Sequence, residues 1–561
     1  MIEINGINYE FSQGETILEV ARRNKIKIPT LCYMKDILEE SSCRICMVEN
    51  LQNGRLMTAC STRAEDGMKI ATDSDAVIKS RKHTLEMLLS NHHKDCINCQ
   101  KNGNCDLQVL FNKYGINETS NRFTKKKYEI DNSSPCIVRD INKCILCGRC
   151  QNVCKNVQSV SALTKQQRGF DTFMGCAFDM PISESTCVGC GQCVLACPTG
   201  ALVEKSELNE VIRLLNDENN YVTCQIAPSV RVSLAEIFDE DIGTFDEGRM
   251  VSALKQIGFK KVFDINLGAD FTVEEESKEL LERIKNNKRL PQFSSCCPAW
   301  FKFVERFYPQ YLDHISTCKS PTEMLGAIVK NYYSHKNNID KDKIKVVGIM
   351  PCTAKKGEKQ RAKDVDYVIT TRELAKLIEY KGIDYLSLEG EKFDSPLSSY
   401  SGGGLIFGVT GGVTEAVLRH VCAKLDKNTS KIEFNEVRNS GGRKEVEVVA
   451  GDTKINLCIV NGLANARRVL DDIIAGKVSY DFVEVMACPG GCINGGGQAY
   501  VDRSKYTTAD IIAKRSKSLY EKDRQMQTRI SADNKTMNEI YDEFFIPSPN
   551  KAKELLHYRH D

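Results

Sequence analysis

Two cysteine runs, "CILCGRCQNVC" (144–154) and "CVGCGQCVLACP" (187–198), determine the fold of the middle of this chain. Each run has the spacing C-x2-C-x2-C-x3-C, in which three cysteines hold one [4Fe–4S] cubane and the fourth serves a second cubane. Pro198 follows the second run as usual, and Lys155 stands in place of proline after the first. The runs therefore predict a two-cluster, ferredoxin-like domain over 136–205, with one cluster held by Cys144, Cys147, Cys150 and Cys197 and the other by Cys187, Cys190, Cys193 and Cys154.

The whole chain of 561 residues holds 26 cysteines, most of them in short C-x2-C runs that a disulfide framework would not require. A formal net charge of +2 gives no electrostatic reason to expect a nucleic acid or an anionic membrane as partner. The start "MIEINGINYEF" (1–11) lacks the features of a signal peptide, and no apolar run approaches the ~20 residues that span a bilayer. We therefore expect a cytoplasmic protein whose thiols bind metal in a reducing compartment.

Upstream of the two runs, residues 1–77 predict a small β-grasp domain of the plant-ferredoxin-like kind. Alternating apolar residues flank Asn5-Gly6, which is a type I′ hairpin signal, and "ETILEVARRN" (15–24) has the pattern of an amphipathic helix. The spacing C-x10-C-x2-C-x13-C suits a [2Fe–2S] cluster, although the plant-type spacing is C-x4-C-x2-C, and zinc is the alternative on ligand type. The ligands would be Cys32, Cys43, Cys46 and Cys60.

Between these two parts, residues 78–124 carry "NHHKDCINCQKNGNC" (91–105), with the spacing H-x3-C-x2-C-x5-C. One nitrogen and three sulfurs suit tetrahedral zinc as well as a [4Fe–4S] cluster, so the motif alone leaves both open. Either His92 or His93 could be the nitrogen ligand. The polar stretch 119–134 is typical of a linker. The candidate ligands of this domain are Cys96, Cys99 and Cys105 with one of these two histidines, and the family resemblance described below favours His92 by its spacing.

Downstream, residues 206–561 alternate helical patterns with short β-rich runs such as "KVFDIN", "IKVVGIM" and "DFVEVMACPGG", which predicts a large α/β domain with parallel strands. Three cysteine segments stand where such runs break into loops: "SSCCPAW" (294–300), "MPCTAKKGE" (350–358) and "EVMACPGGCINGGGQ" (484–498). Glycine lets a backbone approach a bound object closely. Cysteines in the last segment indicate that this object is bound through sulfur.

These three segments resemble the signature motifs of [FeFe]-hydrogenases, and the cysteine motifs ahead of them resemble the cluster train of the multi-cluster clostridial enzymes. The resemblance extends to "QIAPSVR" (225–231) and "IFGVTGGVTEA" (406–416). It implies an H-cluster, which is a [4Fe–4S] cubane joined to a diiron unit with carbon monoxide, cyanide and a dithiolate amine. The cubane ligands would be Cys297, Cys352, Cys488 and Cys492, with the Cys492 sulfur bridging to the diiron unit.

The resemblance also implies roles for residues around the cluster. Lys355 would donate to one cyanide as a charge-assisted hydrogen bond. The glycines at 495–497 would let the backbone pack against the cofactor. By composition alone, the methionines of the site would be ordinary core residues. The remaining residues that would line the cofactor are Pro228, Ser229, Met350 and Met486.

A proton relay follows from the same resemblance, since Cys296 adjoins a ligand and is surplus to the cubane. In the order that we expect, the relay consists of Cys296, Glu279, Ser316 and Glu276 and ends near Arg283. The spacing of the two glutamates and the arginine, i, i+3 and i+7, places them along one face of a helix. Without the neighbouring motifs, a solvated Glu/Arg stripe would be the better interpretation.

The sequence thus predicts a ferredoxin-linked [FeFe]-hydrogenase that interconverts protons and H2, with one [2Fe–2S] and three accessory [4Fe–4S] clusters. The expected partners are ferredoxin, flavodoxin or a flavin/NAD(P) subunit, together with maturation factors for the diiron unit. The alternatives are an H2 sensor, an electron-carrying subunit of a larger complex, and an iron–sulfur assembly protein that lacks the diiron pocket. Ser294, Thr322 and Ala499 depart from the family pattern without removing a ligand or a relay group.

Six further cysteines have no role in this scheme, and we expect them to be small buried apolar residues. Cys318 is of most interest, because it lies two residues after the predicted relay residue Ser316. The six are Cys136, Cys176, Cys224, Cys318, Cys422 and Cys458. The ending after residue 518 predicts helices and resembles the small C-terminal subdomain of the family.

Overall fold

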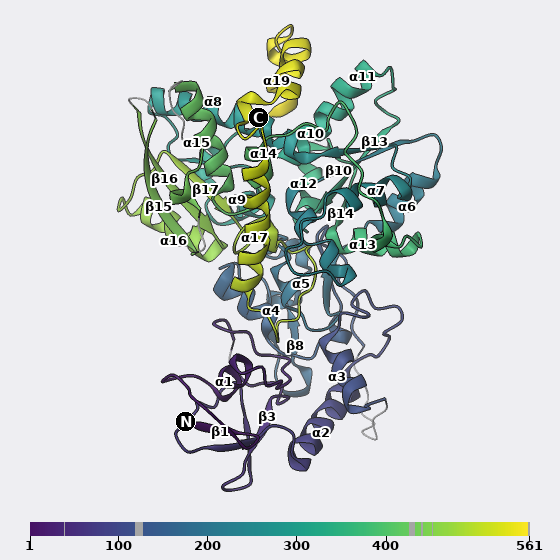
Figure 1. Cartoon of the computed structure of the whole chain (residues 1–561), viewed down its shortest axis with the longest axis vertical. Coiled ribbons are helices and arrows are strands. Elements are labelled where there is room, and N and C mark those ends of the chain that lie inside the picture. The colour runs from purple at the N-terminus through teal and green to yellow at the C-terminus, as the bar shows by residue number, and fades with distance from the viewer. Residues whose placement is uncertain (39, 118–126, 426–431, 439–440, 451–452, 559–561) are drawn as a thin grey trace.

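The computed structural model describes the chain except for residue 39 and the segments 118–126, 426–431, 439–440, 451–452 and 559–561. An N-terminal β domain, a cysteine-rich middle and a large domain of two lobes follow one another along the longest axis (Figure 1). The mixed α/β class predicted from the sequence is confirmed.

The N-terminal domain is a five-stranded sheet with one helix packed on it. β1 and β2 form an antiparallel hairpin in which Ile4 faces Ile7, and Asn5 and Gly6 both have positive φ, as a type I′ turn requires. The predicted hairpin is therefore confirmed. Helix α1 (Ile17–Arg23) begins at a capping box of Thr16 and Glu19. The sheet order is β2 (Ile7–Tyr9), β1 (Ile2–Ile4), β5 (Lys69–Ala71), β3 (Met47–Asn50) and β4 (Arg55–Thr58).

The middle of the chain holds two helices and a compact cysteine-rich unit. Helices α2 (Asp75–Asn91) and α3 (Asp106–Tyr114) carry the His/Cys motif between them. Part of the linker predicted at 119–134 lies outside the described residues, and 127–134 contain no helix or strand. In the following unit, β6 (Ile137–Arg139) and β9 (Leu202–Glu204) pair in antiparallel fashion. Two short helices, α4 (Arg149–Asn152) and α5 (Gln192–Ala196), lie between these strands in the sequence.

The first lobe of the large domain is built on a four-stranded parallel sheet in the order β11-β10-β13-β14. Most residues of its strands are buried and many of them are apolar, as expected for parallel strands covered by helices. The strands are β10 (Tyr221–Ile226), β11 (Lys261–Asp264), β13 (Ile344–Met350) and β14 (Tyr367–Thr370). The helices of this lobe include α6 (Leu208–Asn216), α7 (Gly248–Ile257), α10 (Pro321–Ile328), α12 (Lys355–Ala362) and α13 (Thr371–Tyr380).

The second lobe contains a sheet in the order β12-β17-β16-β15, in which only β15 runs antiparallel to its neighbour. The 22-residue helix α8 (Ile265–Asn286) is buried along most of its length and contacts α10 of the first lobe as well as α14 and α15. The other elements are β12 (Gln292–Phe293), α9 (Pro298–Phe307), α14 (Gly402–Ile406), α15 (Gly412–Leu425), β15 (Arg443–Ala450), β16 (Thr453–Asn461), α16 (Leu463–Ile474) and β17 (Phe482–Met486).

The C-terminal part is helical, as predicted, and consists of α17 (Thr508–Gln525), α18 (Lys535–Ile540) and α19 (Pro549–Leu556). Residues 315–319, which lie beside β12 through a bridge between Ile315 and Phe293, are called the segment behind β12. After α19 the chain pairs with this segment, because the Lys319 N–H donates to Leu556 O (2.8 Å) and the Tyr558 N–H donates to Thr317 O (2.8 Å). This pairing brings the end of the described chain to the predicted relay. In the described part of the protein, no helix has both the length and the apolar character that crossing a bilayer requires.

Candidate functional site

A cavity with about 780 Å³ of space free of protein atoms lies at the edges where strands of both lobes end. Cys352 follows β13, Cys488 follows β17, and Cys297 follows β12 and begins α9. Cys492 stands one turn after Cys488. All four thiols line the cavity. In open α/β folds, ligands bind at the carboxyl ends of the strands, which is where this cavity lies.

Burial and mutual proximity raise the pKa of these thiols. For Cys352, burial is the main cause, the charge of Cys297 adds to it, and the pKa rises to about 11. The pKa of Cys488 is raised for the same reasons, with Cys352 and Cys190 as its strongest neighbours. Four thiols that hinder one another's ionisation require a positive centre between them, which an iron–sulfur cubane supplies. The donor set therefore fits such a cluster.

The remaining wall of the cavity contains all the lining residues predicted from the sequence, namely Pro228, Ser229, Met350, Lys355 and Met486. Lys355 is buried, and its ammonium group is held by an ion pair to Glu358 Oε2 (2.6 Å). An ammonium group has three N–H donors, so this one can serve an anionic group in the cavity as well. The wall thus fits a group larger than a cubane and partly negative.

Sequence reasoning missed the lining contributed by Ile265 and Ala269 of α8 and by Phe407. Phe407 belongs to the quoted stretch 406–416, so a signal for it existed. The two α8 residues precede the predicted relay residues on the same helix. Helix α8 therefore serves both the wall of the cavity and the relay.

Cys296 also borders the cavity, next to the ligand candidate Cys297. Burial, followed by the charge of the Glu276 carboxylate, raises the pKa of the Cys296 thiol well above its usual value. The thiol is therefore protonated at neutral pH and can donate a hydrogen bond.

The other relay residues form a chain of polar contacts on α8 and on the segment behind β12. Ser316 Oγ donates to Glu279 Oε2 (2.8 Å), and Arg283 Nη2 forms an ion pair with Glu279 Oε1 (2.6 Å). Glu276 Oε1 accepts from the Ser295 N–H (3.3 Å), and Glu276 Oε2 has no hydrogen-bond partner among the described residues. Burial and then the Glu279 charge raise the pKa of Glu276 to about 8, although the Ser295 N–H and, next, the Ser316 hydroxyl lower it.

The expected order of the relay is therefore wrong in one respect. Glu276, not Glu279, is the carboxyl next to Cys296, since it accepts from the adjoining Ser295 N–H and its charge raises the pKa of the Cys296 thiol. Glu279 lies at the far end, where it pairs with Arg283. The sequence spacing placed both carboxyls on one helical face but could not show which end of that face points to the cavity.

The two runs of the middle unit bring their cysteines together in two groups. A second cavity, of about 440 Å³, is lined by Cys144, Cys147, Cys150 and Cys197. Cys154 belongs to the other group: after burial, its charge contributes to the raised pKa of the thiols of Cys187, Cys190 and Cys193. Cys190 borders the large cavity as well, so the second group of thiols adjoins the candidate cubane site.

The thiols of the N-terminal part also lie together. Cys46 Sγ donates to Cys60 Sγ (3.2 Å), and the pKa of Cys32 is lowered mainly by a hydrogen bond from Cys43, with Cys60 contributing. In the His/Cys motif, burial raises the pKa of the Cys105 thiol at the start of α3, and the charge of Cys99 adds to this effect. His92 is buried directly after α2, and its neighbour His93 is half-buried.

The glycines at 495–497 also make close approaches to other parts of the protein. A Cβ on Gly496 would lie 2.5 Å from Cys190 O and 2.6 Å from Gly191 Cα. A Cβ on Gly495 would meet Pro351 O. Only Gly495 of the three lines the cavity. This segment therefore joins the middle unit to the large domain.

Family profiles match five successive parts of the chain. The iron only hydrogenase large subunit, C-terminal domain, matches residues 220–496, and the iron hydrogenase small subunit matches 509–561. Ahead of them, a 2Fe-2S iron-sulfur cluster binding domain matches 1–75, the NADH-ubiquinone oxidoreductase-G iron-sulfur binding region 81–120, and a 4Fe-4S dicluster domain 143–201. The chain belongs to the iron-only, or [FeFe]-, hydrogenase family, as the motifs predicted. The family implies H2 oxidation and proton reduction at an H-cluster, with [2Fe–2S] and [4Fe–4S] clusters.

Similar proteins span the full length of the chain. The NADP-reducing hydrogenase subunit HndD of Solidesulfovibrio fructosivorans is 41% identical, over 99% of this chain and 98% of that protein. Iron hydrogenase 1 of Clostridium pasteurianum is 38% identical, over 100% of this chain and 99% of that protein. A solved structure of an [FeFe]-hydrogenase from Chlamydomonas reinhardtii aligns with a TM-score of 0.56 and 33% identity, over 64% of this chain and 99% of that one.

Proposed function

We propose that the chain interconverts H2 with protons and electrons at an H-cluster held by Cys297, Cys352, Cys488 and Cys492. The observation that carries this proposal is the convergence of four thiols on one cavity, with a fifth, Cys296, beside them and next to a buried carboxyl. An electron-carrying subunit needs the four thiols alone. A fifth thiol, a buried lysine and a chain of carboxyls are what proton chemistry at the same cavity requires.

When bound, the H-cluster supplies the redox chemistry and an open iron site that polarises H2. The residues of the chain then bind and position it. Lys355, held by Glu358, would donate to an anionic ligand of the bound group. Ser229 and Pro228 border the same space, and Met350, Met486 and Phe407 exclude water from it.

Protons move between this cavity and the surface through Cys296, Glu276, Ser316 and Glu279, in that order. The Cys296 thiol and the Glu276 carboxyl are both protonated at neutral pH, so each can give up a proton and take another. The described residues provide no direct hydrogen bond between these two groups, so proton transfer between them requires a bridging water. Ser316 passes the proton to Glu279, and Arg283 positions Glu279 at the outer end.

Accessory clusters bound by the cysteine groups ahead of the large domain would carry electrons to and from the cavity. We propose four units, 1–77, 78–124, 136–205 and 206–561, with one [2Fe–2S] and three accessory [4Fe–4S] clusters. The contact of Cys190 with the large cavity supports an entry point at the cluster of Cys187, Cys190, Cys193 and Cys154. Iron and sulfide analysis tests this number of clusters. Replacing the four cysteines of one cluster by alanine must remove the iron of that cluster and of no other.

The electron partner is a ferredoxin, a flavodoxin or a flavin/NAD(P) subunit. The likeness to an NADP-reducing hydrogenase subunit supports the last of these. We expect the matured chain by itself to reduce ferredoxin with H2 and to leave NADP⁺ unreduced until a flavin subunit is added. Reduction of NADP⁺ by the chain alone would contradict this assignment of the nucleotide chemistry to a partner.

Infrared spectroscopy of the matured protein tests the central proposal. Bands of iron-bound carbon monoxide and cyanide must appear after treatment with competent maturation factors, and H2 evolution must appear with them. The Cys492→Ala variant serves as control and must show neither. A matured protein that holds its iron–sulfur clusters without these bands would be an electron carrier or an assembly protein instead.

A further inference from the structure

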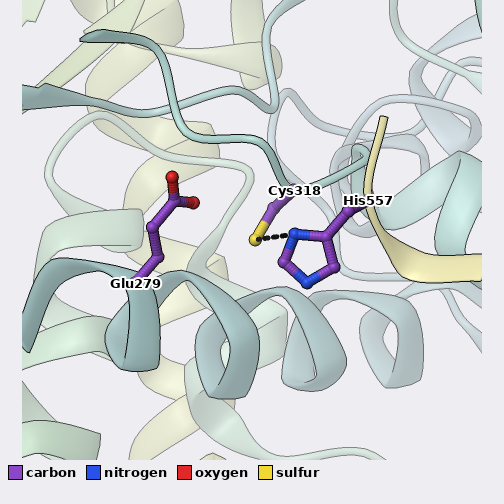
Figure 2. A group of neighbouring side chains, drawn as sticks. All are labelled: Glu279, Cys318 and His557. Carbon is purple, nitrogen blue, oxygen red and sulfur yellow. Dashed lines mark hydrogen bonds between the residues drawn. The ribbon is translucent and has the colours of Figure 1, made fainter. Parts of the chain in front are cut away.

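Three donor groups meet at the outer end of the proton relay, from parts of the chain that are far apart in sequence. Glu279 comes from α8, Cys318 from the segment behind β12, and His557 from the strand-like end after α19. One ligand atom of each residue lies within 4.8 Å of those of the other two. Figure 2 shows the Cys318 sulfur facing the His557 ring, with the Glu279 carboxylate on the other side.

The histidine of this group is oriented as metal-binding histidines are. His557 Nε2 lies 3.0 Å from Glu275 Oε2, so Nε2 donates its proton to this carboxylate. In that tautomer, Nδ1 carries a lone pair, and Nδ1 faces Cys318 Sγ at 4.0 Å and Thr317 Oγ1 at 2.8 Å. A carboxylate behind a histidine fixes both the tautomer and the ring orientation at metal sites. Glu275 is in turn held by Tyr541 Oη (2.5 Å).

We propose that Glu279, Cys318 and His557 form a binding site for a borderline divalent cation of the zinc type. Thiolate, imidazole and carboxylate are the three ligand classes that Zn²⁺ takes, and three protein ligands with a water in the fourth position make a tetrahedral site. Ligand atoms of such a site are about 3.5 Å apart, so small rotations of the three side chains close it. Binding releases the thiol proton of Cys318 to solvent.

The cation competes with the contacts that Glu279 makes in the relay. Glu279 accepts from Ser316 Oγ and from the Thr317 N–H (3.0 Å), and a carboxylate oxygen that coordinates zinc is withdrawn from these donors. This consequence rests on the proposed function, in which Glu279 is the outer proton carrier. Zinc at this site is therefore a reversible inhibitor of turnover, acting without contact with any cluster.

X-ray absorption at the zinc edge tests the site directly on the matured, cluster-loaded enzyme with zinc chloride as the probe. We expect one Zn–S distance of about 2.3 Å and N/O distances of about 2.0–2.2 Å, with no loss of iron. The Cys318→Ala variant must lose the sulfur shell, whereas Cys458→Ala, which removes a buried thiol of β16, must keep it. A sulfur-rich shell with loss of iron would place zinc at the cluster cysteines and overturn the proposal.

Inhibition by zinc gives the second measurement, with each variant compared with its own zinc-free rate. Replacement of a ligand, as in Cys318→Ala or His557→Gln, must raise the half-inhibiting zinc concentration, and Glu275→Gln must raise it about 10–100-fold through the loss of ring orientation. A half-inhibiting concentration that none of these changes moves would refute the site. Zinc bound with the expected shell but without effect on turnover would support the site and remove Glu279 from the proton path.

Discussion

The two cysteine-lined cavities of this protein have the same number of cluster thiols but different walls. The smaller, of about 440 Å³, surrounds its four thiols mainly with aliphatic side chains such as Ile141, Leu163 and Leu202. The larger, of about 780 Å³, adds a lysine, a serine, two methionines, the surplus thiol of Cys296 and the thiol of Cys190 from the adjoining group. A thiol quartet fixes a cluster in both places. The smaller cavity has one cationic side chain, Arg139, whereas the larger combines a buried lysine with a surplus thiol next to a buried carboxyl, which can move a proton.

The fifth thiol is the sharpest difference between the two cavities. The Cys296→Ala variant must lose H2 evolution and uptake by roughly 10³-fold, because a lost proton donor costs 10²–10⁴-fold, while its iron content stays unchanged. The corresponding change in the smaller cavity, Cys150→Ala, must lower the iron content. Rate assays with reduced viologen and iron analysis of both variants check this. Iron loss in Cys296→Ala would show that Cys296 is a cluster ligand. The larger cavity would then lack the surplus thiol that distinguishes it from the smaller one.

The buried carboxyl behind that thiol comes next. Glu276→Gln must lower turnover by about 10²-fold or more, since an amide occupies the same space but cannot carry a proton. Glu282→Gln, on the exposed face of α8, must leave the rate unchanged. The pKa of Glu276 is about 8, so the carboxyl is protonated below that pH and ionised above it. Wild-type H2 evolution must therefore decline as the pH rises through about 8. A profile that is flat there would contradict the assignment.

The sequence predicted the ligands better than the relay, and the reason is physical. Cluster ligands stand at fixed short spacings, because a cubane has fixed corners, so 144–154 and 187–198 specify their own grouping and its exchange of fourth ligands. The relay depends on how α8 turns toward the segment behind β12. Spacing placed Glu276 and Glu279 on one face, and only packing showed that Glu276 lies toward the cavity.

For the same reason, the sequence could not predict contacts between residues that are far apart in the chain. Nothing local relates Cys318 to His557, which are 239 residues apart, and their contact arises from the bridge that the C-terminal segment forms. The glycines at 495–497 illustrate the same limit. Their composition indicated a close approach, but it could not show that the backbone at Cys190, Gly191 and Pro351 is among the groups approached.

A smaller effect is expected from the lysine that distinguishes the larger cavity. Lys355→Met must reduce activity by about 10²-fold, the usual cost of one charge-stabilising donor, and must weaken the infrared bands of the diiron unit. Lys356→Met is the matched control, because Lys356 is equally buried in an ion pair, with Glu373 (2.8 Å), and does not line the cavity. Equal losses of the infrared bands in both variants would indicate a general packing defect.

The smallest effect concerns the glycine segment 495–497, where the large domain packs against the middle unit. In Gly496→Ala, the new methyl group must push against Cys190 O and Gly191 Cα, 2.5 Å and 2.6 Å away, which are backbone atoms of the middle unit. Such overpacking costs about 1–3 kcal/mol of stability. Because Cys190 belongs to the adjoining thiol group, electron entry must slow as well, whereas hydrogen–deuterium exchange at the H-cluster, which needs no accessory cluster, must persist. Gly348→Ala, with ordinary contacts of 3.5–3.6 Å, is the control. If Gly496→Ala is destabilised but still transfers electrons at the wild-type rate, the junction is needed for packing and not for electron entry.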